Sequence, residues 1–149
     1  MLAGGGQPLG GVHHERAAPG PLGRVIRVGA GEHPGQRIIY LSSIAAVQAW
    51  PGGAAYGGAK AALNVLANVV HLELADSGIR TVAIAPGLTY SPGMRAIVSE
   101  DHLNRVAGNY PGGRIGEPED IVALTNFLCS DAANHLSGTV ITVRPPVTR

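Results

Sequence analysis

The composition of this sequence favours a packed globular chain and excludes several classes of protein. Of its 149 residues, 45% are hydrophobic and 14% charged, and the formal net charge is +1. The basic residues form no cluster, so we expect no nucleic-acid partner. No apolar run is long enough to span a bilayer, so no membrane association is expected. The N-terminus lacks the apolar stretch of a signal peptide, which predicts a cytoplasmic location.

The cysteine and histidine content adds little chemistry. The single cysteine, Cys129, allows no internal disulfide, and its apolar surroundings predict a small buried hydrophobe. The six histidines show no metal-ligand spacing, so we expect no metal site.

The chain divides into two unequal parts. Residues 1–36 hold ten of the 22 glycines and four of the 11 prolines, which indicates an atypical Gly/Pro-rich N-terminal segment. Gly29, Gly31 and Gly35 do not form a nucleotide-binding loop, because the sequence leaves no room for a helix after them. Residues 37–149 show the alternation of a folded domain.

Strand and helix patterns alternate from residue 37 onward. The apolar and β-branched runs predict strands, and the segments with helical spacing, stopped by Gly or opened by Pro, predict helices. In chain order we expect a strand at 37–43, a helix at 56–76, a strand at 79–85, helices at 93–106 and 118–130, and a strand at 139–143. Such an order with short connections predicts an α/β fold: a partial doubly wound, Rossmann-like parallel sheet of about three core strands with helices.

A tyrosine and a lysine provide the chemical signal of the chain. Tyr56 and Lys60 are four residues apart, which places them on one face of the predicted helix. Ser43 closes the first strand, thirteen residues before Tyr56. A hydroxyl at a strand end and a phenol at the next helix start can meet at the edge of the sheet where α/β proteins bind ligands. These groups indicate proton transfer to or from a carbonyl or alcohol oxygen.

Four segments together resemble the C-terminal half of the short-chain dehydrogenases/reductases. They are Arg37–Ser43 with Tyr56–Ala62, Val82–Gly87, Arg114–Ile121 and Leu136–Val143, in the family's order. The resemblance implies an oxidoreductase that binds NAD or NADP and moves a hydride between the nicotinamide and a carbonyl or alcohol substrate.

The resemblance also implies roles for individual residues. Tyr56 would be the general acid or base, Lys60 would stabilise its ionised form and bond the nicotinamide ribose, and Ser43 would orient the substrate oxygen. Ser42 is the less favoured serine because its spacing to Tyr56 is fourteen. The remaining cofactor contacts would come from the segment that follows the strand 79–85, namely Pro86, Gly87, Leu88 and Ser91. The flanking loop residues Trp50, Tyr90, Pro92 and Met94 are equally well interpreted as pocket wall or as loop anchors.

The sequence departs from the family at its N-terminal half. The Gly-rich loop that holds the pyrophosphate in the family is absent here. Two interpretations therefore stay open: the chain is an active enzyme, or it is a truncated, non-catalytic remnant. A remnant would act only as a binding or oligomerisation module, or would need a partner chain. In the family the helix corresponding to 56–76 packs against its mate, so we expect a homo-oligomer through this helix.

Overall fold

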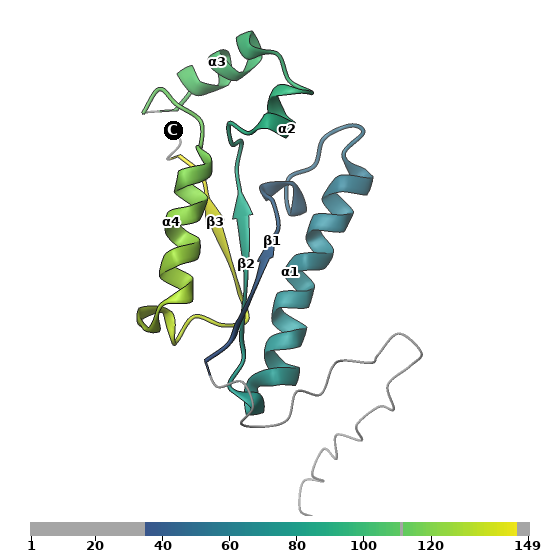
Figure 1. Cartoon of the computed structure of the whole chain (residues 1–149). Coiled ribbons are helices and arrows are strands. Elements are labelled where there is room, and N and C mark those ends of the chain that lie inside the picture. The colour runs from purple at the N-terminus through teal and green to yellow at the C-terminus, as the bar shows by residue number, and fades with distance from the viewer. Residues whose placement is uncertain (1–34, 111, 146–149) are drawn as a thin grey trace, which may run out of the picture.

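The computed structural model describes residues 35–110 and 112–145, and within them a three-stranded parallel sheet in the order β1-β2-β3. Figure 1 shows the sheet between the long helix α1 and the helix α4. The strands are β1 (Arg37–Leu41), β2 (Arg80–Pro86) and β3 (Thr139–Val143). The main helices are α1 (Ala54–Leu74), α2 (Pro92–Arg95), α3 (Glu100–Gly108) and α4 (Pro118–Cys129). The predicted α/β class and parallel sheet are confirmed.

The central strand β2 is buried on both faces. Val82 and Ile84 pack with Leu128 of α4 in the core cluster, whereas the Thr81 hydroxyl, on the opposite face, donates to the Ala67 carbonyl of α1. Since alternate residues of a strand face opposite sides, α1 and α4 cover opposite faces of the sheet. This burial explains why β2 is apolar along nearly its whole length.

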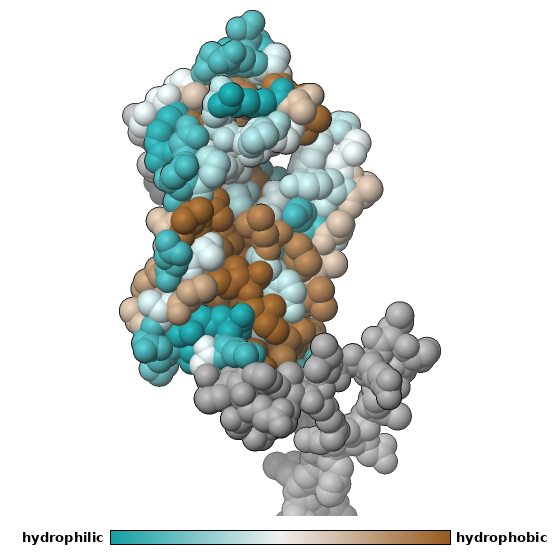
Figure 2. All heavy atoms as spheres, in the orientation of Figure 1, coloured by the Kyte–Doolittle hydropathy of each residue, from teal (hydrophilic) through white to brown (hydrophobic). Residues whose placement is uncertain are grey.

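The apolar face of the sheet extends to the surface at β1. Leu41, at the end of this strand, is 55% exposed, and Ile39 is only partly buried against the core. Figure 2 shows apolar side chains over the middle of the molecule, between α4 and α1, and mainly hydrophilic ones over α3. Beside β1 the molecule therefore presents apolar surface to solvent.

The predicted helix 56–76 is confirmed with slightly shifted ends. Helix α1 starts at Ala54, and after Leu74 a single 3-10 turn, Ala75–Ser77, completes it. Gly78 then has φ +70, in the left-handed region that glycine adopts without steric cost. None of the helices in the described ranges is long and apolar enough to cross a membrane.

The prediction of one helix at 93–106 was wrong, because the structure has two helices there. Helix α2 ends at Arg95, and α3 begins at Glu100. Ser99 has extended backbone, and its side chain accepts a hydrogen bond from the His102 amide. A serine that caps a new helix in this way competes with continuation of the previous one.

The prediction of a buried Cys129 was also wrong, since its side chain is exposed. Its neighbour Leu128 is 3% exposed and packs on the sheet. Successive helical residues are rotated by about 100°, so Cys129 points away from the face that Leu128 buries. The Gly/Pro-rich segment 1–36 lies outside the described residues except for Gly35 and Gln36.

Candidate active site

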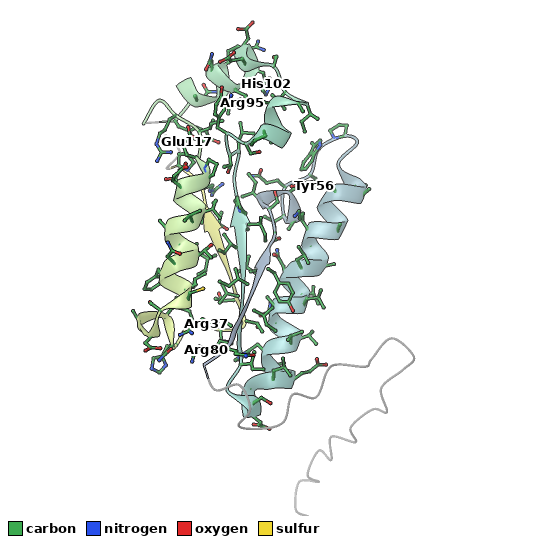
Figure 3. The ribbon with its side chains drawn as sticks, in the orientation of Figure 1. Arg37, Tyr56, Arg80, Arg95, His102 and Glu117 are labelled. Carbon is green, nitrogen blue, oxygen red and sulfur yellow. The ribbon has the colours of Figure 1, made fainter. Side chains whose placement is uncertain are left out.

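The candidate site lies where β1 and β2 end and α1 begins. Ser42 and Ser43 follow β1 directly, and the Ser42 amide donates to the Ile84 carbonyl of β2 over 2.7 Å. Both strands are parallel, so their carboxyl ends share one edge of the sheet, and Pro86 ends β2 at that edge. Figure 3 shows Tyr56 near this edge, on the first turns of α1.

Tyr56 and Lys60 lie side by side, as their spacing predicts. The Lys60 Nζ is 5.7 Å from the centroid of the Tyr56 ring. It also donates a hydrogen bond of 2.9 Å to the carbonyl of Leu41, which fixes the ammonium at the end of β1. Tyr56 is 52% exposed, so a molecule from solution can reach its phenol. The pair combines a fixed positive charge with an accessible proton donor.

The two serines have different partners. Ser42 is 3% exposed, and its hydroxyl donates to the Lys60 carbonyl over 2.9 Å, which ties β1 to α1. Ser43 caps a short 3-10 helix, η1 (Ile44–Ala46), by accepting from the Ala45 amide over 3.1 Å. That bond uses a lone pair of the Ser43 oxygen, so its proton can still be donated to a bound molecule. Of the two hydroxyl protons, that of Ser42 is therefore already used in a hydrogen bond within the protein, and that of Ser43 is not.

A close backbone approach holds the start of α1 against η1. A Cβ atom built on Gly57 would lie 2.8 Å from the Ala45 carbonyl oxygen, closer than side chains tolerate. Gly57 follows Tyr56 directly, so this contact sets the position of the phenol relative to Ser43. A hollow of about 380 Å³ opens on the same side, lined by residues 45–50 and by Gly53, Ala54, Gly57 and Gly58.

The segment from Pro86 to Ser91 leaves the sheet at the same edge. The Gly87 amide donates to the Val143 carbonyl of β3 over 2.8 Å, and the Leu88 carbonyl accepts from the Gly116 amide over 3.0 Å. Ser91 caps helix α2, since its oxygen accepts from the Met94 amide over 3.3 Å. Ser91 thus has a structural partner that its sequence position did not reveal.

Two groups near the site were missed as functional candidates. The Leu41 carbonyl holds Lys60, and a backbone acceptor of this kind leaves no trace in the sequence. Arg114 forms a two-pronged ion pair with Asp120, at 2.7 and 3.0 Å. The spacing of six residues between Arg114 and Asp120, across the start of an apolar helix, is a sequence signal for this ion pair.

Trp50 lies against the ring of Tyr56. Its ring centroid is 6.5 Å from that of Tyr56, with the planes tilted by 53°. The Trp50 ring also covers Gly53, where an added Cβ would lie 2.5 Å from it. The structure supports both open interpretations of Trp50: the ring packs against the start of α1, and it also lines the hollow.

The ion pair between Arg114 and Asp120 lowers the pKa of the Asp120 carboxyl to about 2, from an ordinary value of 3.8. The main cause is the hydrogen bond from Arg114, and the second is the hydrogen bond from the Glu117 amide. The same hydrogen bond raises the pKa of Arg114. Because the folded-state pKa of the carboxyl is depressed, its contribution to stability is present above its ordinary value and is lost as the pH falls through about 2. At neutral pH the pair is fully ionised.

Among the described residues, no three His, Cys, Asp or Glu side chains come together as metal ligands.

Comparisons with known proteins place this geometry in a family. The family model described as enoyl-(acyl carrier protein) reductase matches residues 26–144. The chain belongs to the short-chain dehydrogenase/reductase family, an enzyme family whose members here are named as dehydrogenases and reductases.

Among curated relatives, a tropinone reductase homologue of Arabidopsis thaliana is 40% identical over 106 residues, covering 71% of this chain and 40% of the relative. The 3beta-hydroxysteroid dehydrogenase 1 of Eggerthella lenta is 40% identical over 108 residues, covering 71% and 41%. The chain thus spans about two fifths of the length of these relatives.

Among solved structures, a 7 alpha-hydroxysteroid dehydrogenase in complex with NADH and 7-oxo glycochenodeoxycholic acid has a TM-score of 0.68. It is 30% identical, with 72% of this chain and 42% of that chain covered. A short-chain dehydrogenase/reductase from Brucella melitensis has the same TM-score at 28% identity, covering 74% and 44%.

Proposed function

We propose that this chain supplies the proton-transfer site of an NAD- or NADP-dependent oxidoreductase that interconverts a carbonyl and an alcohol. The observation that carries the proposal is the placement of Tyr56 beside the Lys60 ammonium, with Ser43 at the same edge of the sheet. Bound nicotinamide would supply the hydride to the carbonyl carbon. The Tyr56 hydroxyl would give its proton to the carbonyl oxygen, and the reverse steps would oxidise an alcohol.

The residues at the edge of the sheet fit a nicotinamide nucleotide. Lys60 uses one ammonium proton on the Leu41 carbonyl and keeps two donors for the hydroxyls of a ribose. Pro86, Gly87 and Leu88 would face the nicotinamide ring, and Ser91 would add a hydroxyl near it. A Cβ atom built on Gly87 would lie 3.0 Å from the Cβ of Arg144, so this glycine lets the end of β2 approach the end of β3 and sets where the segment leaves the sheet.

Ser43 would orient the substrate. Its proton is available while its lone pair caps η1, so the oxygen is held in place before any ligand arrives. A preset donor of this kind stabilises charge that develops on the substrate oxygen without reorganisation during the reaction.

The substrate is proposed from the relatives. Their names refer to hydroxysteroids and tropinone, which suggests a ring-bearing ketone or secondary alcohol as substrate. The test is the loss of nicotinamide absorbance when the purified chain meets NADH or NADPH and a panel of a steroid ketone, tropinone and a small acyclic ketone. We expect turnover with at least one cyclic ketone. Saturable cofactor binding without turnover on any panel member would contradict the assignment of this chemistry.

A second proposed property is self-association through α1. Helix α1 has an apolar stripe on the face opposite its buried Ala67, and the exposed fractions of the larger members are 42–77%. The stripe consists of Ala62, Val65, Leu66, Val69 and Leu72. The positions recur at intervals of three and four residues, the spacing of a helix that packs on another helix. A second copy of α1 offers the same apolar face, so a symmetric pair would bury both stripes.

Charged substitutions on this stripe should abolish the association. We expect Val65→Lys with Val69→Lys to convert an oligomer to a monomer, as measured by sedimentation equilibrium, because the lysines would be buried against their counterparts. Lysine favours helix slightly more than valine, so α1 itself should persist. Val122→Lys, the same change at a 55% exposed position of α4, is the matched control and should leave the mass unchanged. An unchanged mass in the double variant would contradict an interface through α1.

A further inference from the structure

One ion pair fixes the backbone beside the proposed nicotinamide segment. After Gly87, the chain leaves the sheet and forms an isolated parallel bridge, Thr89 with Gly116. The Gly116 amide donates to the Leu88 carbonyl over 3.0 Å, and the Gly116 carbonyl accepts from the Tyr90 amide over 2.7 Å. Gly116 therefore forms hydrogen bonds with the segment on both sides of Thr89.

These hydrogen bonds depend on a close approach of Gly116 to Leu88 and Thr89. A Cβ atom on Gly116 would lie 3.2 Å from the Thr89 hydroxyl oxygen and 3.3 Å from the Leu88 carbonyl oxygen. Both distances are tighter than nine in ten real Cβ contacts, so an alanine at this position would require Thr89 or Leu88 to shift by a few tenths of an ångström. The position of Leu88 thus follows the position of the Gly116 backbone.

The ion pair of Arg114 and Asp120 holds the two peptide groups that flank Gly116. Arg114 donates to the Ile115 carbonyl over 3.1 Å, and that peptide's amide is the one bonded to Leu88. Asp120 accepts from the Glu117 amide over 2.8 Å, and that peptide's carbonyl is the one bonded to Tyr90. Each flanking peptide is therefore held at one end by a charge and at the other by the proposed cofactor segment.

The signs of the two charges match the peptide groups that they hold. A cation lies on a carbonyl and an anion on an amide, so each charge polarises its peptide in the direction that strengthens the peptide's second hydrogen bond. The chain between Arg114 and Asp120 is also held in place, because Ile115 is buried at 5% exposure and Pro118 starts α4 directly after Glu117.

We propose that Arg114 and Asp120 are positioning residues that hold Leu88 in place for the nicotinamide, through the two peptides of Gly116. This inference rests on the proposed cofactor site. Neither side chain needs to touch the cofactor, and the arrangement, which we call the Arg114–Asp120 brace, acts on the backbone alone.

The test compares Asp120→Asn with Asp131→Asn. The control makes the same chemical change in the other ion pair found among the described residues, Asp131 with Arg37 at 3.4 Å, and Arg37 lies at the opposite end of β1 from the site. Amide exchange of Gly116 and Tyr90 is measured by nitrogen-15 NMR without cofactor, and the Kd for NADH is measured by fluorescence. The Asp120 pKa of about 2 keeps the brace ionised throughout such measurements.

In Asp120→Asn we expect faster exchange at Gly116 and Tyr90 and an NADH Kd raised about tenfold, since a hydrogen bond to a charged group is lost. Amides of β2 such as Ala83 should keep their exchange rates, and Asp131→Asn should alter neither quantity. A merely structural role would change the midpoint of unfolding but leave the Kd unchanged, and that outcome would overturn the inference.

A charge reversal gives a second test. Arg114→Asp with Asp120→Arg restores an ion pair but places an anion on the Ile115 carbonyl and a cation on the Glu117 amide. We expect no recovery of NADH affinity. Recovery would show that the signs of the two charges do not matter, and it would overturn the argument from the peptide groups.

Unchanged amide exchange in Asp120→Asn would reject the Arg114–Asp120 brace but not the proposed function. If the unmodified chain does not bind NADH, the proposed function fails, and the positioning role fails with it.

Discussion

Replacing Tyr56 with phenylalanine is expected to lower kcat by about 10²–10⁴-fold, the range of a positioned acid–base group. The substitution removes only the hydroxyl, so the ring should keep its contacts with Trp50 and with the Lys60 ammonium. The Kd for the cofactor and the midpoint of thermal unfolding should therefore stay close to those of the unmodified chain. Steady-state kinetics, cofactor titration and thermal unfolding measure the three quantities.

The matched control is Tyr40→Phe, the same change in β1, on a side chain that is partly buried and outside the candidate site. It should leave kcat unchanged. Full activity in Tyr56→Phe would remove the phenol from the mechanism, and the proton would then have to come from another group.

The adjacent serines should separate catalysis from folding. We expect Ser43→Ala to lower kcat by about 10²–10³-fold, the range found when a preset donor to the substrate oxygen is lost. Its cap on η1 would also be lost, at a cost of about 0.5–2 kcal/mol. Ser42→Ala should instead destabilise the fold, because the Lys60 carbonyl would lose its buried donor.

Kinetics and urea unfolding of both variants distinguish the two effects. The control is Ser130→Ala, the same change at the end of α4, where the hydroxyl donates to the Phe127 carbonyl away from the site. If Ser42→Ala lost turnover while Ser43→Ala kept it, the roles of the two serines would have to be exchanged. The thirteen-residue spacing to Tyr56 and the buried bond of Ser42 both favour Ser43.

Much of the fold could be predicted because its signals are local. The β3 strand was predicted with its observed bounds, and α4 within one residue, because Pro118 and the acidic residues after it mark the helix start. The error at 93–106 has a local cause as well, since Ser99 can be read either as a helical residue or as a cap.

The site could be predicted only in part. The spacing of Tyr56 and Lys60 fixes their shared helix face, and the structure brings Ser43 to the same edge. The bond of Lys60 to the Leu41 carbonyl and the grip of Gly116 on Leu88 join residues far apart in sequence, and backbone partners carry no residue signature. The roles of individual site residues, the boundary at residue 36 and the cytoplasmic location stay predictions.

The central claim is that these residues form a working cofactor site, and a titration with NADH and NADPH tests it most directly. The purified chain is titrated while nicotinamide fluorescence is followed, with Lys60→Ala as the comparison. The account predicts saturable binding that Lys60→Ala abolishes or strongly weakens, because the variant loses the ammonium that donates to the ribose. No binding at millimolar cofactor, or equal binding by the variant, would contradict it.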